Sequence, residues 1–289
     1  MKIKILISFL LSFLFLYVFY KTVGFEEAKK EFEALNPIYV GIGFTLYAFS
    51  SFLRAYRWHL MIKDINMKDF FLINNVHIFL NNILPARTGE FSFFYMLKKR
   101  GINLTKSFWI FALARLMDAL ALLGFFFGFF FKFYFVAFIV VFGLIMVFLL
   151  KHTIAILPNI FILKSLKQNL STHFESKTAI KLYFISVMSF AFKFLGFYEM
   201  AKNIIPMGFF EILPSYVLAE LSSILPINGV MGLGTYEFGF SIPSKLTDIS
   251  LKTSLDLGFI THVFLLVSSS ILGILSLLFL KLEHYKEER

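Results

Sequence analysis

Residues 83–90 read ILPARTGE and residues 224–229 read ILPING, and these two short segments are the most informative part of the sequence for predicting the fold. The second continues through Gly232 and Gly234 to Glu237. Both lie in very apolar surroundings, where a proline and glycines interrupt the helix. Transporters place substrate sites at such broken segments in matching halves, because the freed backbone groups can coordinate polar ligands at membrane depth. The pattern indicates a transporter-like protein without naming its substrate.

The composition excludes an ordinary water-soluble domain. Of the 289 residues, 58% are apolar and 16% are charged, whereas about a quarter of the residues in soluble domains are charged. Six apolar runs are long enough to cross a bilayer, which takes about 20 residues. We therefore predict an all-α polytopic membrane protein with a single transmembrane domain over residues 1–289. The predicted spans are 3–20, 37–57, 107–131, 133–150, 182–201 and 255–280.

The sequence also excludes several kinds of chemistry. The chain has no cysteine, which rules out disulfides, thiolate metal sites and cysteine nucleophiles. Its net charge of +10 comes from bases beside apolar runs, which favours anionic lipid headgroups over nucleic acid as the partner. A Walker A loop, a Gly-x-Ser-x-Gly elbow and a His-Glu-x-x-His motif are all missing. We therefore expect no cofactor, no metal and no catalytic residue.

The distribution of lysines and arginines favours two re-entrant hairpins over two further spanning helices. If residues 70–97 and 209–243 each enter and leave on one side, most basic residues lie on the cytoplasmic side, as the positive-inside rule requires. If both segments span, the two richest basic loops move across the membrane. We therefore predict about six spanning helices, two re-entrant helical hairpins and cytoplasmic termini. The half-repeats 37–131 and 182–280 are then inverted relative to one another.

At these residues the chain resembles the transmembrane family of lysylphosphatidylglycerol synthases, also called the flippase-like domain family. The matching stretches are Asn82 to Glu90, Ala114 to Asp118, and Leu225 to Glu237, and the likeness covers nearly the whole chain. The resemblance implies a multi-pass protein of the cytoplasmic (inner) cell membrane. Its partner would be a membrane lipid, either an anionic phospholipid or a lipid-linked sugar, moved between leaflets.

The chain departs from the family pattern in two places. No aminoacyltransferase domain follows Arg289, so we expect this chain not to aminoacylate a lipid. In the second half, Thr261 and His262 stand where the family pattern leads us to expect an arginine. An anionic contact equivalent to that of Arg115 is therefore in doubt there.

Charged and amide residues near the broken segments are the candidates for substrate binding. An arginine fork suits phosphate and a charge at membrane depth is costly, so we expect Arg87 to contact a lipid phosphate. Glu90 could pair with Arg87, and we expect it to have a structural role. Arg115 and Asp118 share a helix face and could pair with each other or across to the hairpin. The predicted substrate-binding set is Arg87, Glu90, Arg115, Asp118, Glu237, Asn82 and Asn228. The predicted hairpin-breaking set is Pro85, Gly89, Pro226, Gly229, Gly232 and Gly234.

Four further residues have weaker interpretations. Glu237 could bind a proton or cation that drives transport, or it could accept hydrogen bonds from freed amides of the hairpin. We assign no role to Lys193, which could extend its ammonium group toward the membrane interface or meet Glu199. Arg54 and Arg57 are interpreted as ordinary anchors at the membrane interface.

Two alternatives to a lipid transporter stay open. The first is a non-catalytic assembly factor for a lipid- or glycan-modifying enzyme, in which the same residues only stabilise the hairpins. The second is an acyltransferase-like lipid enzyme that uses His59 and Asp64, whose spacing matches a lipid acyltransferase dyad. Two common residue types at one spacing arise easily by chance, so this second signal is weak.

Overall fold

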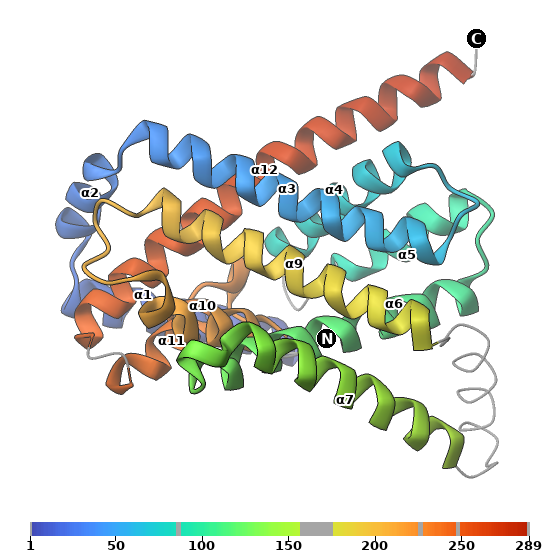
Figure 1. The fold of residues 1–289 in the computed structure, drawn as a ribbon. Helices are drawn as coiled ribbons and strands as arrows, with labels where there is room; N and C mark the ends of the chain where they lie inside the picture. Colours follow the sequence, from blue (N-terminus) through green and yellow to red (C-terminus); the bar gives the residue numbers. More distant parts are fainter. Residues whose placement is uncertain (1, 85–87, 157–175, 225–227, 247–248, 288–289) are drawn as a thin grey trace.

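The computed structural model describes residues 2–84, 88–156, 176–224, 228–246 and 249–287, and this part of the chain contains helices and no strands (Figure 1). The predicted all-α fold is confirmed. The α-helices are α1 (Lys2–Thr22), α2 (Phe25–Ala34), α3 (Pro37–Met61), α4 (Met67–Ile83), α5 (Glu90–Lys99), α6 (Leu104–Phe129), α7 (Phe135–Ile156), α9 (Ser176–Met200), α10 (Phe209–Ser223), α11 (Thr235–Ser241) and α12 (Leu251–Glu287). Short 3₁₀ turns are η2 (Lys132–Tyr134), η3 (Val230–Gly232) and η4 (Ile242–Lys245).

The predicted spans coincide with helices that can cross a membrane. Within the described residues, α3, α6, α7, α9 and α12 are long and apolar enough to do so. A sixth candidate is the pair α1 and α2, which is bent by 81°. The bend falls at Gly24, whose φ of 86° favours glycine. The cytoplasmic position of the termini and the inverted repeat stay predictions.

Asparagine side chains fix where three of the central helices begin. Asn36 accepts a hydrogen bond from the Ile38 amide at 2.9 Å before α3, and Pro37 occupies the first turn. Asn66 and Asn103 cap α4 and α6 in the same way. Each cap satisfies an amide that the helix leaves unpaired, which is worth about 1 kcal/mol. The caps therefore fix the residue at which each of these three helices begins.

The two broken segments form short helix pairs. Helix α4 has 17 residues and α10 has 15, fewer than the roughly 20 needed to cross a bilayer. Each packs against the short helix that follows it, α4 on α5 and α10 on α11. A Cβ at Gly89 would lie 2.3 Å from the Asn81 amide nitrogen, so this close approach of α5 to α4 requires glycine. Three predicted residues, Pro85, Arg87 and Pro226, lie outside the described residues.

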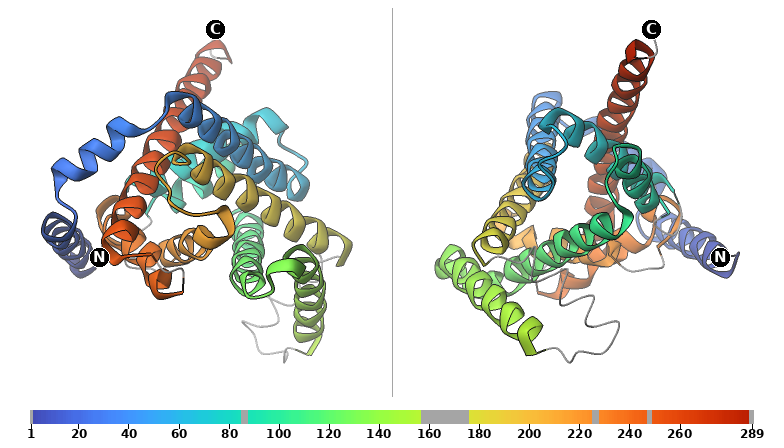
Figure 2. Two further views of the ribbon diagram at one scale, coloured as in Figure 1. Left: turned by 60° about the vertical axis from the view of Figure 1, so that its left-hand side comes forward. Right: turned by 90° about the vertical axis from the view of Figure 1, so that its right-hand side faces the viewer.

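Helices from the two halves of the chain interlock. Helix α3 runs along α9, α4 packs on α12, and α10 packs on α6. Gly43 and Gly196 bring α3 and α9 into close contact, because a Cβ at Gly43 would lie 2.6 Å from the Gly196 carbonyl oxygen. Ser50 and Ser189 donate hydrogen bonds to each other's carbonyl oxygens, at 2.7 and 3.1 Å. Helices α1 and α7 lie at opposite edges of this bundle (Figure 2).

Candidate functional site

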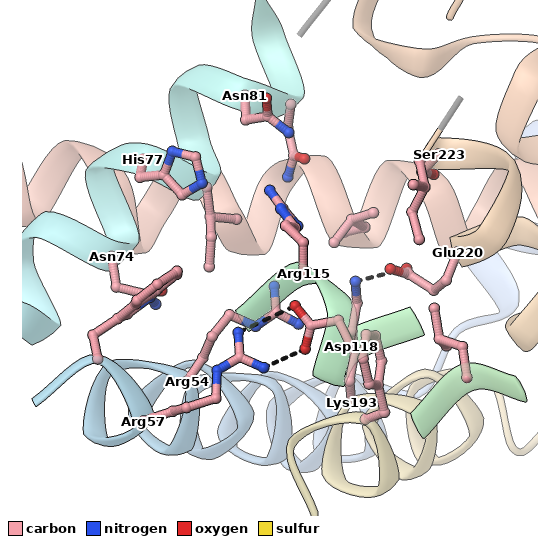
Figure 3. A pocket seen from close by; sticks show the side chains of 17 residues that line it. Arg54, Arg57, Asn74, His77, Asn81, Arg115, Asp118, Lys193, Glu220 and Ser223 are labelled. Carbon is pink, nitrogen blue, oxygen red and sulfur yellow. Dashed lines mark hydrogen bonds and ion pairs between the residues drawn. The ribbon is translucent and has the colours of Figure 1, made fainter. Parts of the chain in front are cut away.

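The crossing helices enclose a polar cavity of about 90 Å³. Its walls come from α3, α4, α6, α9, α10 and α12, and charged side chains converge on it from four of them (Figure 3). Such groups are costly inside a membrane protein and mark function by default. The charged lining residues are Arg54, Arg57, Arg115, Lys193, Asp118 and Glu220.

Arg57 and Asp118 form a buried ion pair between α3 and α6. Arg57 is 1% exposed and Asp118 is 5% exposed. Both guanidinium nitrogens Nη1 and Nη2 bond the two carboxylate oxygens, and the second of these bonds measures 3.1 Å. The Arg57 Nη1 group also donates to Ser186 Oγ on α9. Interpreting Arg57 as an interface anchor is therefore wrong, because α3 continues to Met61 and neighbouring helices cover this side chain.

A second buried pair joins α9 to the second broken segment. Lys193 Nζ lies 2.6 Å from Glu220 Oε1, with side chains 6% and 11% exposed. The suggested contact of Lys193 with Glu199 is wrong. Glu199 lies in the last turn of α9 and pairs at 3.1 Å with Lys202, which follows the end of that helix. Lys193 and Glu220 thus connect the spanning helix to α10.

The third pair confirms one of the alternatives left open for Arg115, a partner on the hairpin. Arg115 Nη2 lies 3.3 Å from Glu90 Oε1, and both side chains are about a third exposed. The Arg115 guanidinium also stacks over Phe111, 4.9 Å from the ring centroid. Arg115 and Asp118 therefore have separate partners, α5 and α3, although they share a face of α6.

Arg54 differs from the other three bases. Within the described residues it makes no ion pair and no hydrogen bond, and its guanidinium carbon lies 5.6 Å above the centroid of Phe190. Asp118 lies within its electrostatic range, but that carboxylate is already bonded to Arg57. Three cavity bases thus have a carboxylate partner of their own and the fourth does not. An excess positive charge remains at the cavity wall.

Amide side chains of α4 line the same cavity and form hydrogen bonds that connect α4 to other helices. Asn74 accepts a hydrogen bond from Trp58 Nε1 at 3.1 Å and donates to Ser51 on α3. The predicted site residue Asn82 donates to Ser269 on α12 at 3.0 Å. These amides hold α4 between α3 and α12.

The two broken segments meet at a second, smaller cavity of about 50 Å³. Asn81 and Asn82 line it from the end of α4, while Asn228 and Gly232 line it from the other segment. Asn228 donates to the Ser223 carbonyl oxygen at 3.1 Å, which closes the turn after α10. The small cavity shares Asn81, Asn82 and Ser223 with the larger one, so the two are neighbours.

Glu237 lies in the first turn of α11, next to the smaller cavity, and is fully buried. One of its oxygens accepts a hydrogen bond from the Gly234 amide at 2.7 Å, as one of its two interpretations predicted. The φ of 89° at Gly234 requires glycine for this turn. The other oxygen lies 2.7 Å from Nδ1 of His262, which is 3% exposed and stacks on Tyr236.

Sequence reasoning missed four residues of the larger cavity: Arg54, Arg57, Lys193 and Glu220. The signal for the first two was their spacing of three on an apolar helix, which places both on one face. His59 and Asp64, the alternative enzyme pair, have other partners. His59 Nδ1 bonds the Ile65 carbonyl oxygen at 2.9 Å, and Asp64 meets Lys106 at 3.3 Å.

Comparison with known proteins agrees with this architecture. Residues 5–273 match the family model of the lysylphosphatidylglycerol synthase TM region. A relative, the UPF0104 membrane protein MJ1595 of Methanocaldococcus jannaschii, is 31% identical over 135 residues, which make up 43% of this chain and 40% of that protein. The match therefore spans two fifths of the length of that relative. No solved structure matches the chain. Because the family model covers most of its length, this multi-pass membrane protein belongs to the lysylphosphatidylglycerol synthase transmembrane region family.

Proposed function

We propose that this protein moves an anionic amphipathic lipid between the leaflets of the cytoplasmic (inner) cell membrane. The headgroup would enter the larger cavity while the acyl chains stay in the bilayer. The observation that carries the proposal is Arg54, a base without a carboxylate partner among the described residues, on the wall of a cavity inside a membrane protein. A phosphate is the partner that such a guanidinium binds best.

The size of the cavity fits this division of the lipid. A volume of about 90 Å³ has room for several waters, since one water needs only about 10–15 Å³ of such space. It leaves no room for two acyl chains, which therefore remain outside. A phospholipid and a lipid-linked sugar both carry phosphate next to the lipid, so both chemistries fit.

The paired charges have a supporting part in this proposal. Arg57 with Asp118, and Lys193 with Glu220, hold four helices together around the cavity without changing its net charge. Arg115 is more exposed and its pair with Glu90 spans the first broken segment, so an entering phosphate could exchange with that carboxylate. Arg87 keeps its predicted role as a further phosphate contact.

Leaflet-resolved lipid movement in liposomes tests the proposal. The purified protein is placed in phosphatidylcholine vesicles with NBD-labelled phosphatidylglycerol, and in others with a labelled lipid-linked sugar phosphate. Arg54→Gln should slow movement of the accepted probe about tenfold or more, the rate equivalent of a charge-assisted hydrogen bond of about 1.5–3 kcal/mol. The neutralisation leaves no carboxylate unpaired, so the variant should fold.

The matched control is Lys106→Gln, which also neutralises one base but lies in an exposed pair with Asp64 and lines neither cavity. It should move the probe at close to the rate of the unaltered protein. Failure of the unaltered, folded protein to move either probe would overturn the proposal. That result would favour the assembly-factor alternative, in which a lipid- or glycan-synthesis enzyme is the partner.

A further inference from the structure

The buried pair of Glu237 and His262 uses only one of the two ring nitrogens. His262 Nδ1 contacts the carboxylate, and no other hydrogen bond of this ring occurs among the described residues. Nε2 is directed elsewhere: a Cβ at Gly232 would lie 3.2 Å from it and from the adjacent ring carbon. Gly232 and His262 both line the smaller cavity. One side of the ring thus meets a buried acid and the other side meets this space.

The smaller cavity is built to hold water. Asn81 Oδ1 and Asn228 Oδ1 are buried acceptors without a hydrogen-bond partner in the described part of the chain. Both residues line this cavity, and buried acceptors of this kind are normally satisfied by ordered water. A volume of about 50 Å³ accommodates more than one molecule. Water there can deliver a proton to His262 Nε2.

We propose that His262 and Glu237 form a proton-binding site that couples lipid movement to a pH gradient. The inference rests on the proposed lipid transport and adds its energy source. A proton passes from a hydronium ion in the cavity to the lone pair of Nε2, so that one O–H bond breaks, one N–H bond forms and a neutral water remains. The pair changes from carboxylate with neutral imidazole to carboxylate with imidazolium. Its net charge rises from −1 to zero.

This change in charge links the proton to the lipid phosphate. The larger cavity shares Asn81, Asn82 and Ser223 with the smaller one, so the phosphate site and the proton site are neighbours. A pair carrying −1 repels an incoming phosphate more than a neutral pair does. By linkage, a bound phosphate must favour proton uptake by the same factor. Proton and lipid therefore bind together and cross together.

In the part of the chain that the structure describes, few other titratable groups surround the pair of Glu237 and His262. Tyr236, which stacks on the ring, lies among Tyr47 of α3 and Tyr216 and Glu220 of α10. Helix α4 contributes amides to the cavity. Ser12 of α1 accepts a hydrogen bond from the Val230 amide and donates one to the Leu233 carbonyl oxygen. Glu220 is already paired with Lys193, and a phenol, whose ordinary pKa is about 10, is neutral near pH 7. His262, which contacts Glu237 through one nitrogen and lines the cavity, is therefore the side chain on which we place the proton.

The test uses the full chain in phosphatidylcholine vesicles with NBD-labelled phosphatidylglycerol, with and without a gradient from about pH 6 to about pH 8, the range of histidine titration. Trapped pyranine reports the internal pH. In the unaltered protein we expect the gradient to change the transport rate by about tenfold, within the usual range of coupling between sites. Proton entry should accompany lipid entry.

His262→Asn keeps a donor near the position of Nδ1 and removes the nitrogen that binds the proton. The variant should therefore move the probe at a rate that does not depend on the pH gradient. Glu237→Gln keeps an acceptor for the Gly234 amide but removes the carboxylate that stabilises the imidazolium, so it should weaken the response to the gradient. The control is His59→Asn, because His59 also bonds through Nδ1 but lines neither cavity. It should retain the response.

Each outcome separates the two proposals. Probe movement that is equal with and without the gradient in the unaltered protein would overturn the proton site and leave lipid transport standing. Gradient-driven movement that survives in folded His262→Asn would also overturn it. Failure of the unaltered protein to move the probe under any condition would overturn the transport function for this lipid, and the coupling with it.

Discussion

Replacing Arg57 by leucine should destabilise the protein far more than breaking any surface pair. The change would leave Asp118 charged, 5% exposed and without its two guanidinium bonds. Losing one partner of such a buried pair costs about 3–5 kcal/mol, because the remaining charge keeps its desolvation penalty. Ser186 still donates to the Leu182 carbonyl oxygen at 3.0 Å, so the loss of Arg57 leaves that hydroxyl satisfied. The cost should come from Asp118.

Reversible unfolding in mixed detergent, followed by far-ultraviolet circular dichroism, measures this cost. The double variant Arg57→Leu/Asp118→Leu replaces the pair by apolar side chains and should recover most of the lost stability, because such replacements are often neutral or stabilising. Lys106→Ala is the matched control. Its partner Asp64 is two-thirds exposed, so the pair is worth about 0–1 kcal/mol.

Two results would refute this reasoning. If Arg57→Leu lowered the free energy of unfolding no more than Lys106→Ala does, the Arg57 site would be hydrated, and Asp118 would carry no desolvation penalty. If the double variant were no more stable than Arg57→Leu, the unpaired charge of Asp118 would not be the source of the loss.

Three further predictions concern packing and hydrogen bonds. Gly43→Val should separate α3 from α9, because even a Cβ at this position would lie 2.6 Å from the Gly196 carbonyl oxygen. The free energy of unfolding should fall by at least about 1–3 kcal/mol, the usual cost of overpacking, and thermal unfolding measures this loss. Glu237→Ala should cost about 1–3 kcal/mol, since it leaves a buried amide unpaired, whereas Glu237→Gln should cost less in the same assay. Asn74→Leu removes the acceptor of Trp58 Nε1, so tryptophan emission should shift to shorter wavelength, measured against unaltered protein.

The sequence was sufficient for the helices and for the place where the bundle breaks. Within the described residues, apolar length located the helices that are long enough to cross a membrane. Two glycines that the sequence singled out stand where glycine is needed: a Cβ at Gly89 would meet the backbone of α4, and Gly234 has a positive φ. These are local properties, and local sequence determines them.

The partners of the charges could not be predicted because they depend on how helices pack. Arg57 lies near the end of its predicted span, where a lysine or arginine is normally an interface anchor. Helix α3 continues past it, and α6 and α9 cover it, which no local pattern reveals. Lys193 and Glu220 are likewise far apart in sequence and meet only because α10 lies near α9.

The asymmetry between the two halves explains why one base is left over. Ser50 and Ser189 bond each other's carbonyl oxygens, a reciprocal contact that a two-fold axis between inverted repeats would produce, although the repeat itself stays a prediction. One helical turn beyond these serines, Arg54 and Lys193 both reach the larger cavity. Lys193 meets Glu220 of α10, whereas the described part of α4 offers the cavity amides and an imidazole but no carboxylate. An anion that enters the cavity therefore supplies the negative charge that the first half lacks.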